Sequence, residues 1–119
     1  MRAAVMRNGA IEVGEVPEPI PGPGEVLVRT LACGICGSDL HVLQHTHRFA
    51  ADSGGVGGGI DPGRDLVMGH EFCAEVLDYG PGSGRRLAPG TRVCSMPVLF
   101  RPPQALSVGY SHEFPGGYG

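Results

Sequence analysis

Glycine and proline recur along the whole of this sequence and restrict the folds open to it. The 119 residues include 21 Gly and 11 Pro, with no Trp. Both residues disfavour the interior of a long helix, glycine because it loses the most backbone entropy and proline because it lacks an amide hydrogen. Short strands joined by many turns suit this composition better. We therefore predict a mainly β fold in one domain, since the length is ordinary for one domain and short for two.

Several stretches have the aliphatic and β-branched composition of strands. Asn8-Gly9 is a strong signal for a tight hairpin turn between the first two. Residues 17–24 contain four prolines, so this segment is expected to be an extended surface connector, followed by a mostly buried strand. In the next strand, Phe72, Ala74 and Val76 should share one face. The predicted strands are residues 2–6, 10–16, 25–32, 68–79 and 91–96, with a turn-rich linker at 81–89.

The remaining segments favour a short helix and loops. Ser38 or Asp39 can cap a helix from Leu40 to about Gln44. Residues 50–64 combine many glycines with few apolar anchors and predict a flexible surface loop. A loop is also expected after Pro97. The sequence ends in a glycine-rich stretch, with no final helix or strand predicted to pack against the core. We therefore expect a domain spanning residues 1–119 that is truncated at its C-terminal end.

Charge and the N-terminal sequence bear on partners and location. The formal net charge is −3, which gives no basic field for nucleic acid or anionic lipid. Glu12 and Glu15 lie where a signal peptide needs apolar residues, and no segment approaches the length of a membrane helix. These features predict a cytoplasmic protein whose four cysteines stay reduced, as metal ligands or small buried groups rather than disulfides. Cys33, Cys73 and Cys94 are expected to be the small buried groups.

One set of residues has the chemistry of a zinc site. Cys36, His70 and Glu71 offer thiolate, imidazole and carboxylate, the three donor types that zinc prefers. Glycines flank Cys36 and precede His70, so the backbone can aim both side chains at one point. Asp39 can accept a hydrogen bond from the second ring nitrogen of His70, as metal-bound histidines usually require.

Two motifs carry a specific family resemblance. C-G-I-C-G-S-D-L-H at 33–41 and G-H-E-F-C-A-E-V at 69–76 resemble the paired signature of zinc-dependent medium-chain alcohol dehydrogenases. P-G-P-G-E-V-L-V-R before them and L-A-P-G-T-R-V after them resemble the same family's N-terminal domain. The resemblance implies a GroES-like, partly open β-barrel with one or two short helices.

The resemblance also implies roles for particular residues. Cys36 and His70 would be catalytic zinc ligands, and Glu71 either a direct ligand or a neighbouring carboxylate. Ser38 would touch the substrate hydroxyl, and His41 would be an outer proton acceptor. The implied reaction is hydride transfer between a small-molecule alcohol or polyol and NAD(P), or the reverse reduction of the carbonyl. For the full-length form of such a protein we expect a homo-oligomer.

The sequence also departs from the family pattern. No third protein ligand can be assigned, because the family places it beyond residue 119. No G-x-G-x-x-G is present, so no Rossmann nucleotide-binding domain is expected in these residues and NAD(P) would bind a missing C-terminal domain. The glycine-rich stretch after His41 is longer than usual and sits where it can shape the substrate entrance. Cys73 and Cys94 lack the cysteine cluster of a second, structural zinc.

Other functions remain open at this point. Cys33-x-x-Cys36 can be a redox pair or half of a zinc ribbon, although no second such motif accompanies it. A second alternative is a non-catalytic module that binds zinc through the same ligands but catalyses no reaction. A co-chaperonin-like binding module shares the fold but has no use for the cysteine motif. The isolated 119-residue chain is expected to have no dehydrogenase activity of its own.

Overall fold

A computed structural model describes residues 1–51, 60–101 and 104–119 of the chain. Its elements over these residues are mostly short strands, with two helices between the third and fourth strand. In chain order they are β1 (Arg2–Arg7), β2 (Ala10–Glu15), β3 (Val26–Cys33), α1 (Gly37–Gln44), α2 (Thr46–Ala51), β4 (Leu66–Val67), β5 (Phe72–Tyr79), β6 (Arg92–Cys94), β7 (Val98–Arg101) and β8 (Gln104–Ser107). The prediction of a mainly β fold with one or two short helices is confirmed.

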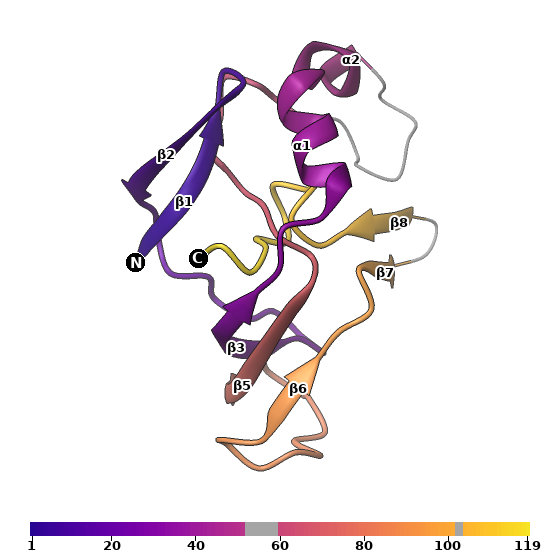
Figure 1. Ribbon diagram of the computed structural model, residues 1–119. Coiled ribbons are helices and arrows are strands. Elements are labelled where there is room, and N and C mark those ends of the chain that lie inside the picture. Colours follow the sequence, from indigo (N-terminus) through magenta and orange to yellow (C-terminus); the bar gives the residue numbers. More distant parts are fainter. Residues whose placement is uncertain (52–59, 102–103) are drawn as a thin grey trace.

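The described strands form three antiparallel sheets, with strand orders β2-β1-β4, β3-β5-β6 and β7-β8. Figure 1 shows the helices at one end of the molecule and the β3-β5-β6 sheet toward the other, with the C-terminal residues running between them. Within the described residues the sheets do not close into a barrel, in agreement with the partly open form that was expected.

The first hairpin has the predicted form. Its strands pair from Arg2 opposite Glu15 to Arg7 opposite Ala10, which leaves Asn8 and Gly9 as the turn. The proline-rich segment that follows contains no strand, as predicted, and leads into β3. The local turn signals therefore identified this region correctly.

Strand β3 is less buried than its composition predicted. Val26 and Leu31 keep 41% and 45% of their surface exposed. The reason is the strand order, since β3 is an edge of its described sheet while β5 is the centre. The fully buried positions are Ala74 and Val76 on β5, on the face that was predicted for them, with Phe72 half-buried.

Helix α1 begins three residues earlier than predicted. Cys36 is its N-cap and Gly37 its first residue, so the prediction that Ser38 or Asp39 caps a helix from Leu40 was wrong. Asp39 lies inside the first turn, and its carboxylate accepts a hydrogen bond from the backbone N–H of Cys36 at 2.9 Å. The acidic side chain therefore caps the helix from its third position.

Two further elements were not predicted. Helix α2 includes the start of the predicted 50–64 loop, whose residues 52–59 lie outside the described part of the chain. The expected loop after Pro97 was also wrong, because β7 and β8 pair as a hairpin from Val98 opposite Ser107 to Arg101 opposite Gln104. The prolines that indicated a loop fall between the strands, at 102–103, outside the described residues.

The main hydrophobic core lies between helix α1 and the small first sheet. It is built from side chains with at most 3% of their surface exposed, contributed by β1, α1, β4 and the segments next to β4. The partly buried rings of Phe49, Tyr110 and Tyr118 pack against it. The buried members are Met6, Val42, Ile60, Leu66 and Met68.

Residues 116–118 form a segment that we call the C-terminal strap. The backbone N–H groups of Gly116, Gly117 and Tyr118 donate to the carbonyls of Val67, Gly69 and Met68 at 2.8, 2.8 and 3.1 Å. The carbonyl of Tyr118 accepts the N–H of Ala4 at 2.9 Å. The sequence indicated no helix or strand that would hold the glycine-rich end of the chain. Because Gly116 and Gly117 have no side chains, the backbone of the strap can lie directly against residues 67–69.

No helix in the described ranges has both the length and the apolar character needed to cross a membrane.

The strap predicts a sharp effect of one methyl group. A Cβ on Gly116 would lie 2.2 Å from the carbonyl oxygen of Met68 and 2.4 Å from that of Gly69. Gly116→Ala should therefore lower the free energy of unfolding by about 1–3 kcal/mol, measured by urea denaturation. In Gly84→Ala the nearest atom to the new Cβ is 3.8 Å away, so this control should change stability by less than about 1 kcal/mol. Equal effects of the two substitutions would contradict the packing described for the strap.

Candidate metal centre

The candidate centre forms where the end of β3 meets the start of β5. Cys33 is paired with Phe72 across the two strands, and the N–H of Gly34 donates to the carbonyl of Glu71 at 2.8 Å. A register shift between Thr30 and Ala32 interrupts the ladder just before this point. The antiparallel pairing thus brings the cysteine motif beside the histidine motif, which lies more than thirty positions later in the sequence.

The turn before His70 depends on a glycine. Gly69 has a φ of +93°, in the left-handed region where other residues are strained. A Cβ at this position would also lie 2.8 Å from the sulfur of Cys33 and 2.8 Å from the ring of Tyr118. The glycine predicted to bend the chain ahead of the histidine is therefore required twice, for its dihedral angle and for its lack of a side chain.

Cys36, His70 and Glu71 come together as the sequence predicted. One ligand atom from each, a sulfur, a ring nitrogen and a carboxylate oxygen, lies within 4.8 Å of the other two. Cys36 and His70 are half-buried and Glu71 is exposed. The donor set is the one that zinc favours, and its exposed side leaves room for a further ligand. Among the described residues, no other group of three Cys, His, Asp or Glu side chains is close enough to hold a metal ion.

Asp39 is the buried anion behind this cluster, with 4% of its surface exposed. Besides the amide of Cys36, it accepts hydrogen bonds from the hydroxyls of Tyr110 at 2.8 Å and Tyr118 at 3.0 Å. A buried carboxylate is costly unless such donors replace water. These bonds fix the first turn of α1 and, with it, the position of Cys36.

The ring of His70 lies between Asp39 and Ser38. Its Nδ1 is 3.5 Å from a carboxylate oxygen of Asp39, and its Nε2 is 3.4 Å from the Oγ of Ser38. Nδ1 is buried and makes no hydrogen bond within the described part of the chain, so the predicted bond to Asp39 has the right partner but is too long here. With Nδ1 turned toward a carboxylate, Nε2 is the nitrogen left for a metal ion.

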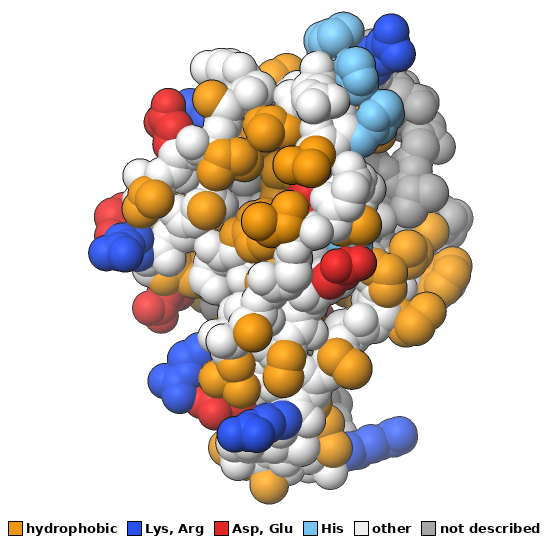
Figure 2. Space-filling model, in the orientation of Figure 1, with side chains coloured by type: hydrophobic (Ala, Val, Ile, Leu, Met, Phe, Trp, Pro, Cys, Tyr) orange, Lys and Arg blue, Asp and Glu red, His pale blue; other side chains and the backbone are white. Residues whose placement is uncertain are grey.

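Ser38 and His41 occupy different surroundings on α1. The Oγ of Ser38 lies within hydrogen-bond distance of the hydroxyl of Tyr110, at 2.9 Å, beside the ring of His70. His41 is exposed, and its ring contacts those of His45 and Phe49, with centroids 4.7 and 5.8 Å away. Figure 2 shows histidine side chains clustered at the end of the molecule that carries the helices. The described contacts do not join His41 to Ser38.

Tyr110 and Tyr118 are parts of the centre that sequence reasoning missed. The ring centroid of Tyr110 is 5.0 Å from that of His70, and the hydroxyl oxygen of Tyr118 also lies 3.2 Å from the carbonyl oxygen of Gly34. Burial raises the pKa of both phenols above its ordinary value, and the neighbouring Asp39 carboxylate raises it further. Both therefore stay protonated and donate. The available signal was that each directly follows a glycine in a chain with three tyrosines.

The other cysteines differ from the prediction that all three are small buried groups. Cys33 is half-buried between Gly69 and Gly117, and this burial raises the pKa of its thiol. Cys73 and Cys94 are exposed. The prediction was wrong for these two because both lie on the outer face of their sheet, opposite to the buried Ala74.

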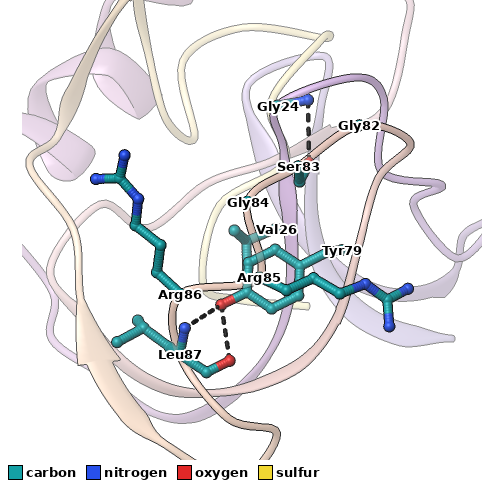
Figure 3. A pocket seen from close by; sticks show the side chains of 9 residues that line it. All are labelled: Gly24, Val26, Tyr79, Gly82, Ser83, Gly84, Arg85, Arg86 and Leu87. Atoms are coloured by element: carbon teal, nitrogen blue, oxygen red, sulfur yellow. Dashed lines mark hydrogen bonds between the residues drawn. The ribbon is translucent and has the colours of Figure 1, made fainter.

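A separate hollow lies at the far end of β3 and β5 (Figure 3). It is bounded by the start of β3, by Tyr79 at the end of β5 and by residues 82–87. The hydroxyl of Tyr79 donates to the carbonyl of Leu87 and accepts from its N–H, both at 2.9 Å. In Figure 3 the guanidinium groups of Arg85 and Arg86 point in different directions rather than toward one another. The polar groups here hold a turn and do not converge on a ligand.

Comparison with known proteins gives matches over nearly the whole chain. The family model for the alcohol dehydrogenase GroES-like domain matches residues 22–118. Glucose 1-dehydrogenase of Thermoproteus tenax is 36% identical over 114 residues, which cover 87% of this chain and 30% of that protein. YphC of Escherichia coli, an uncharacterised zinc-type alcohol dehydrogenase-like protein, is 34% identical over 90 residues, covering 72% of this chain and 23% of that protein.

A solved structure agrees with these matches. An NAD-dependent alcohol dehydrogenase superimposes with a TM-score of 0.75 and 27% identity, covering 100% of this chain and 36% of that one. The chain thus spans between 23% and 36% of the length of these three proteins.

The buried carboxylate gives a test of how the centre is supported. Asp39→Ala removes the acceptor of three hydrogen bonds and leaves the partly buried Tyr110 and Tyr118 hydroxyls without it, so the free energy of unfolding should fall by about 3 kcal/mol. Asp78→Ala is the matched control, since Asp78 is exposed and should cost about 1 kcal/mol or less. Urea denaturation of each variant measures both values. A loss for Asp39→Ala no larger than that of the control would rule out this supporting role.

Proposed function

This chain belongs to the alcohol dehydrogenase GroES-like domain family, and we propose that it is the zinc-binding catalytic domain of an NAD(P)-dependent alcohol or polyol dehydrogenase. The observation that carries the proposal is the convergence of Cys36, His70 and Glu71 from two remote segments. Family membership alone gives the fold and the ancestry. The intact donor set is what argues for a working metal centre rather than a domain that has lost one.

The side chains fit a zinc ion by their chemistry. A thiolate, an imidazole and a carboxylate within 4.8 Å of one another offer three ligands, and the exposed side of the cluster admits a substrate oxygen. We assign Cys36 and His70 as ligands and Glu71 as a carboxylate that either binds directly or lies beside the metal. Bound zinc acts as a Lewis acid that makes a coordinated alcohol easier to deprotonate.

The remaining residues would handle the proton and the orientation of the ligands. Ser38 lies next to the ligand nitrogen of His70, where its hydroxyl can accept the proton of a substrate alcohol. Tyr110 holds the Ser38 oxygen from the other side. His41 follows one turn later on α1, at the surface, and is assigned as the acceptor that passes the proton to solvent. Since the contacts of the described residues do not join His41 to Ser38, a bridging water would carry this last transfer.

The rest of the reaction is assigned to residues beyond this chain. The matched relatives are about three to four times as long, and one structural neighbour is an NAD-dependent alcohol dehydrogenase. We propose that residues 1–119 are the N-terminal domain of such a protein and that a C-terminal domain binds NAD(P). Alcohols and sugars are the proposed substrate class, because the relatives include glucose 1-dehydrogenase. A homo-oligomer is proposed for the full-length form.

Metal content tests the ligand assignment. The protein should bind one zinc ion, and Cys36→Ser or His70→Ala should reduce bound zinc to below about a tenth of that amount, because a site with so few protein ligands loses most of its affinity when one of them is removed. Cobalt substitution should add a sulfur-to-cobalt absorption band that is missing from Cys36→Ser. Cys94→Ser, an exposed cysteine outside the cluster, is the control and should keep both. Full zinc content in Cys36→Ser would refute the assignment.

Turnover tests the role of Ser38. In the full-length protein, Ser38→Ala should lower kcat for alcohol oxidation by about 100-fold while leaving zinc content unchanged, since it removes a proton acceptor but no ligand. Ser95→Ala is the control, because the Ser95 hydroxyl is exposed and bonds the carbonyl of Met96 next to it. NAD(P)H absorbance with a panel of alcohols and polyols provides the rate. A zinc-loaded protein that reduces no nicotinamide with any of them would favour a non-catalytic zinc-binding module.

A further inference from the structure

Strands β5 and β6 place two cysteines directly opposite each other. Cys73 and Cys94 are Cα partners in the antiparallel pairing of these neighbouring strands (Figure 1). Residues in direct register point to the same face of a sheet. Both side chains are exposed and both thiols are free. On its other side Cys73 is paired with Ala32, so Cys94 is the thiol that faces it within the described sheet.

The hydrogen-bond pattern shows which kind of pair this is. The N–H of Val76 donates to the carbonyl of Thr91 at 2.9 Å, while the carbonyl of Val76 accepts the N–H of Gly90 at 2.8 Å, so Val76 lies at a hydrogen-bonding position opposite Thr91. The register continues without a shift through Glu75 opposite Arg92 and Ala74 opposite Val93. Because the two kinds of pair alternate, Cys73 and Cys94 form a non-hydrogen-bonded pair.

This kind of pair suits a disulfide. Its Cα atoms are typically about 4.5 Å apart, with side chains closer than in the hydrogen-bonded kind. Disulfides bridge Cα atoms separated by roughly 4.4–6.8 Å. The typical spacing of such a pair therefore falls within the range that a disulfide can bridge. The two thiols lie on the face opposite to the buried Ala74 and Val76, so a small reagent in water reaches them without opening the core.

We propose that Cys73 and Cys94 are a site of reversible oxidation by thiol–disulfide exchange with a small-molecule disulfide. One cysteine sulfur attacks the small disulfide, whose S–S bond breaks to release one thiol and leave a mixed disulfide. The second cysteine sulfur then attacks this mixed disulfide and releases the other small thiol. The net change is one new S–S bond in the protein, two protons and two electrons passing to the small molecule, and two small thiols as products.

The location gives the bond a structural consequence. Strand β6 is three residues long and is an edge of the described sheet, held by β5 alone. A bond between Cys73 and Cys94 would tie this short strand to β5 and close the intervening chain, including the turn-rich linker, into a loop. Cross-links of this kind restrict the unfolded chain and raise Tm.

Oxidised glutathione is the probe for the experiment, applied to the full-length protein under non-denaturing conditions. The expected product has lost two free thiols and carries no glutathione. Trypsin separates the two cysteines, since cleavage after Arg64 and Arg85 releases the Cys73 peptide and cleavage after Arg92 starts the Cys94 peptide. These two peptides should be joined in the oxidised digest and separate after reduction. Tm of the oxidised protein should rise by about 5 °C and return on reduction.

The single variants Cys73→Ser and Cys94→Ser are the matched controls. Each should accumulate a glutathione adduct on its remaining cysteine and show no rise in Tm, because the second attack is impossible. Three outcomes would overturn the proposal. After treatment, both thiols could still react with iodoacetamide, or the protein without substitutions could carry glutathione adducts but no linked peptides. The third outcome is a disulfide found only in the peptide of residues 30–48, which carries Cys33 and Cys36.

Discussion

The centre depends on one buried negative charge. Asp39 is the only buried charged residue of the described chain, and three donors replace the water it has lost. Those donors come from the first turn of α1 and from two tyrosines more than seventy positions later. The same carboxylate faces the ring of His70. A single anion therefore joins the cysteine-bearing turn to the C-terminal strap beside the ring of His70.

Local signals in the sequence predicted a large share of this arrangement. Asn8-Gly9 located the first hairpin, and the proline run located the connector before β3. Cys36, His70 and Glu71 were recognisable because each motif is short and its glycines have a clear backbone role. Their convergence was also predictable from the family resemblance. What these features share is that the information lies within a few neighbouring residues.

The errors arise where the outcome depends on distant partners. Composition indicated that β3 is buried, but exposure is decided by its place at the edge of the sheet. Cys73 and Cys94 were expected to be buried for the same reason, although their register puts them on the outer face. The only local signal for Tyr110 and Tyr118 is the glycine before each, which does not show that their partner is Asp39. The β7–β8 hairpin was obscured by prolines that turn out to lie between its strands.

The C-terminal strap also determines when the centre can be completed during synthesis. A ribosome makes the chain from the N-terminus, so Cys36, Asp39 and His70 emerge well before Tyr110 and Tyr118. Until residue 118 has left the exit tunnel, Asp39 lacks two of its three donors, and the segment before His70 lacks the backbone that lies against it. A nascent chain therefore exposes the proposed metal ligands before they are held in place, and a zinc ion arriving at that stage would meet an unassembled set of side chains instead of the finished centre.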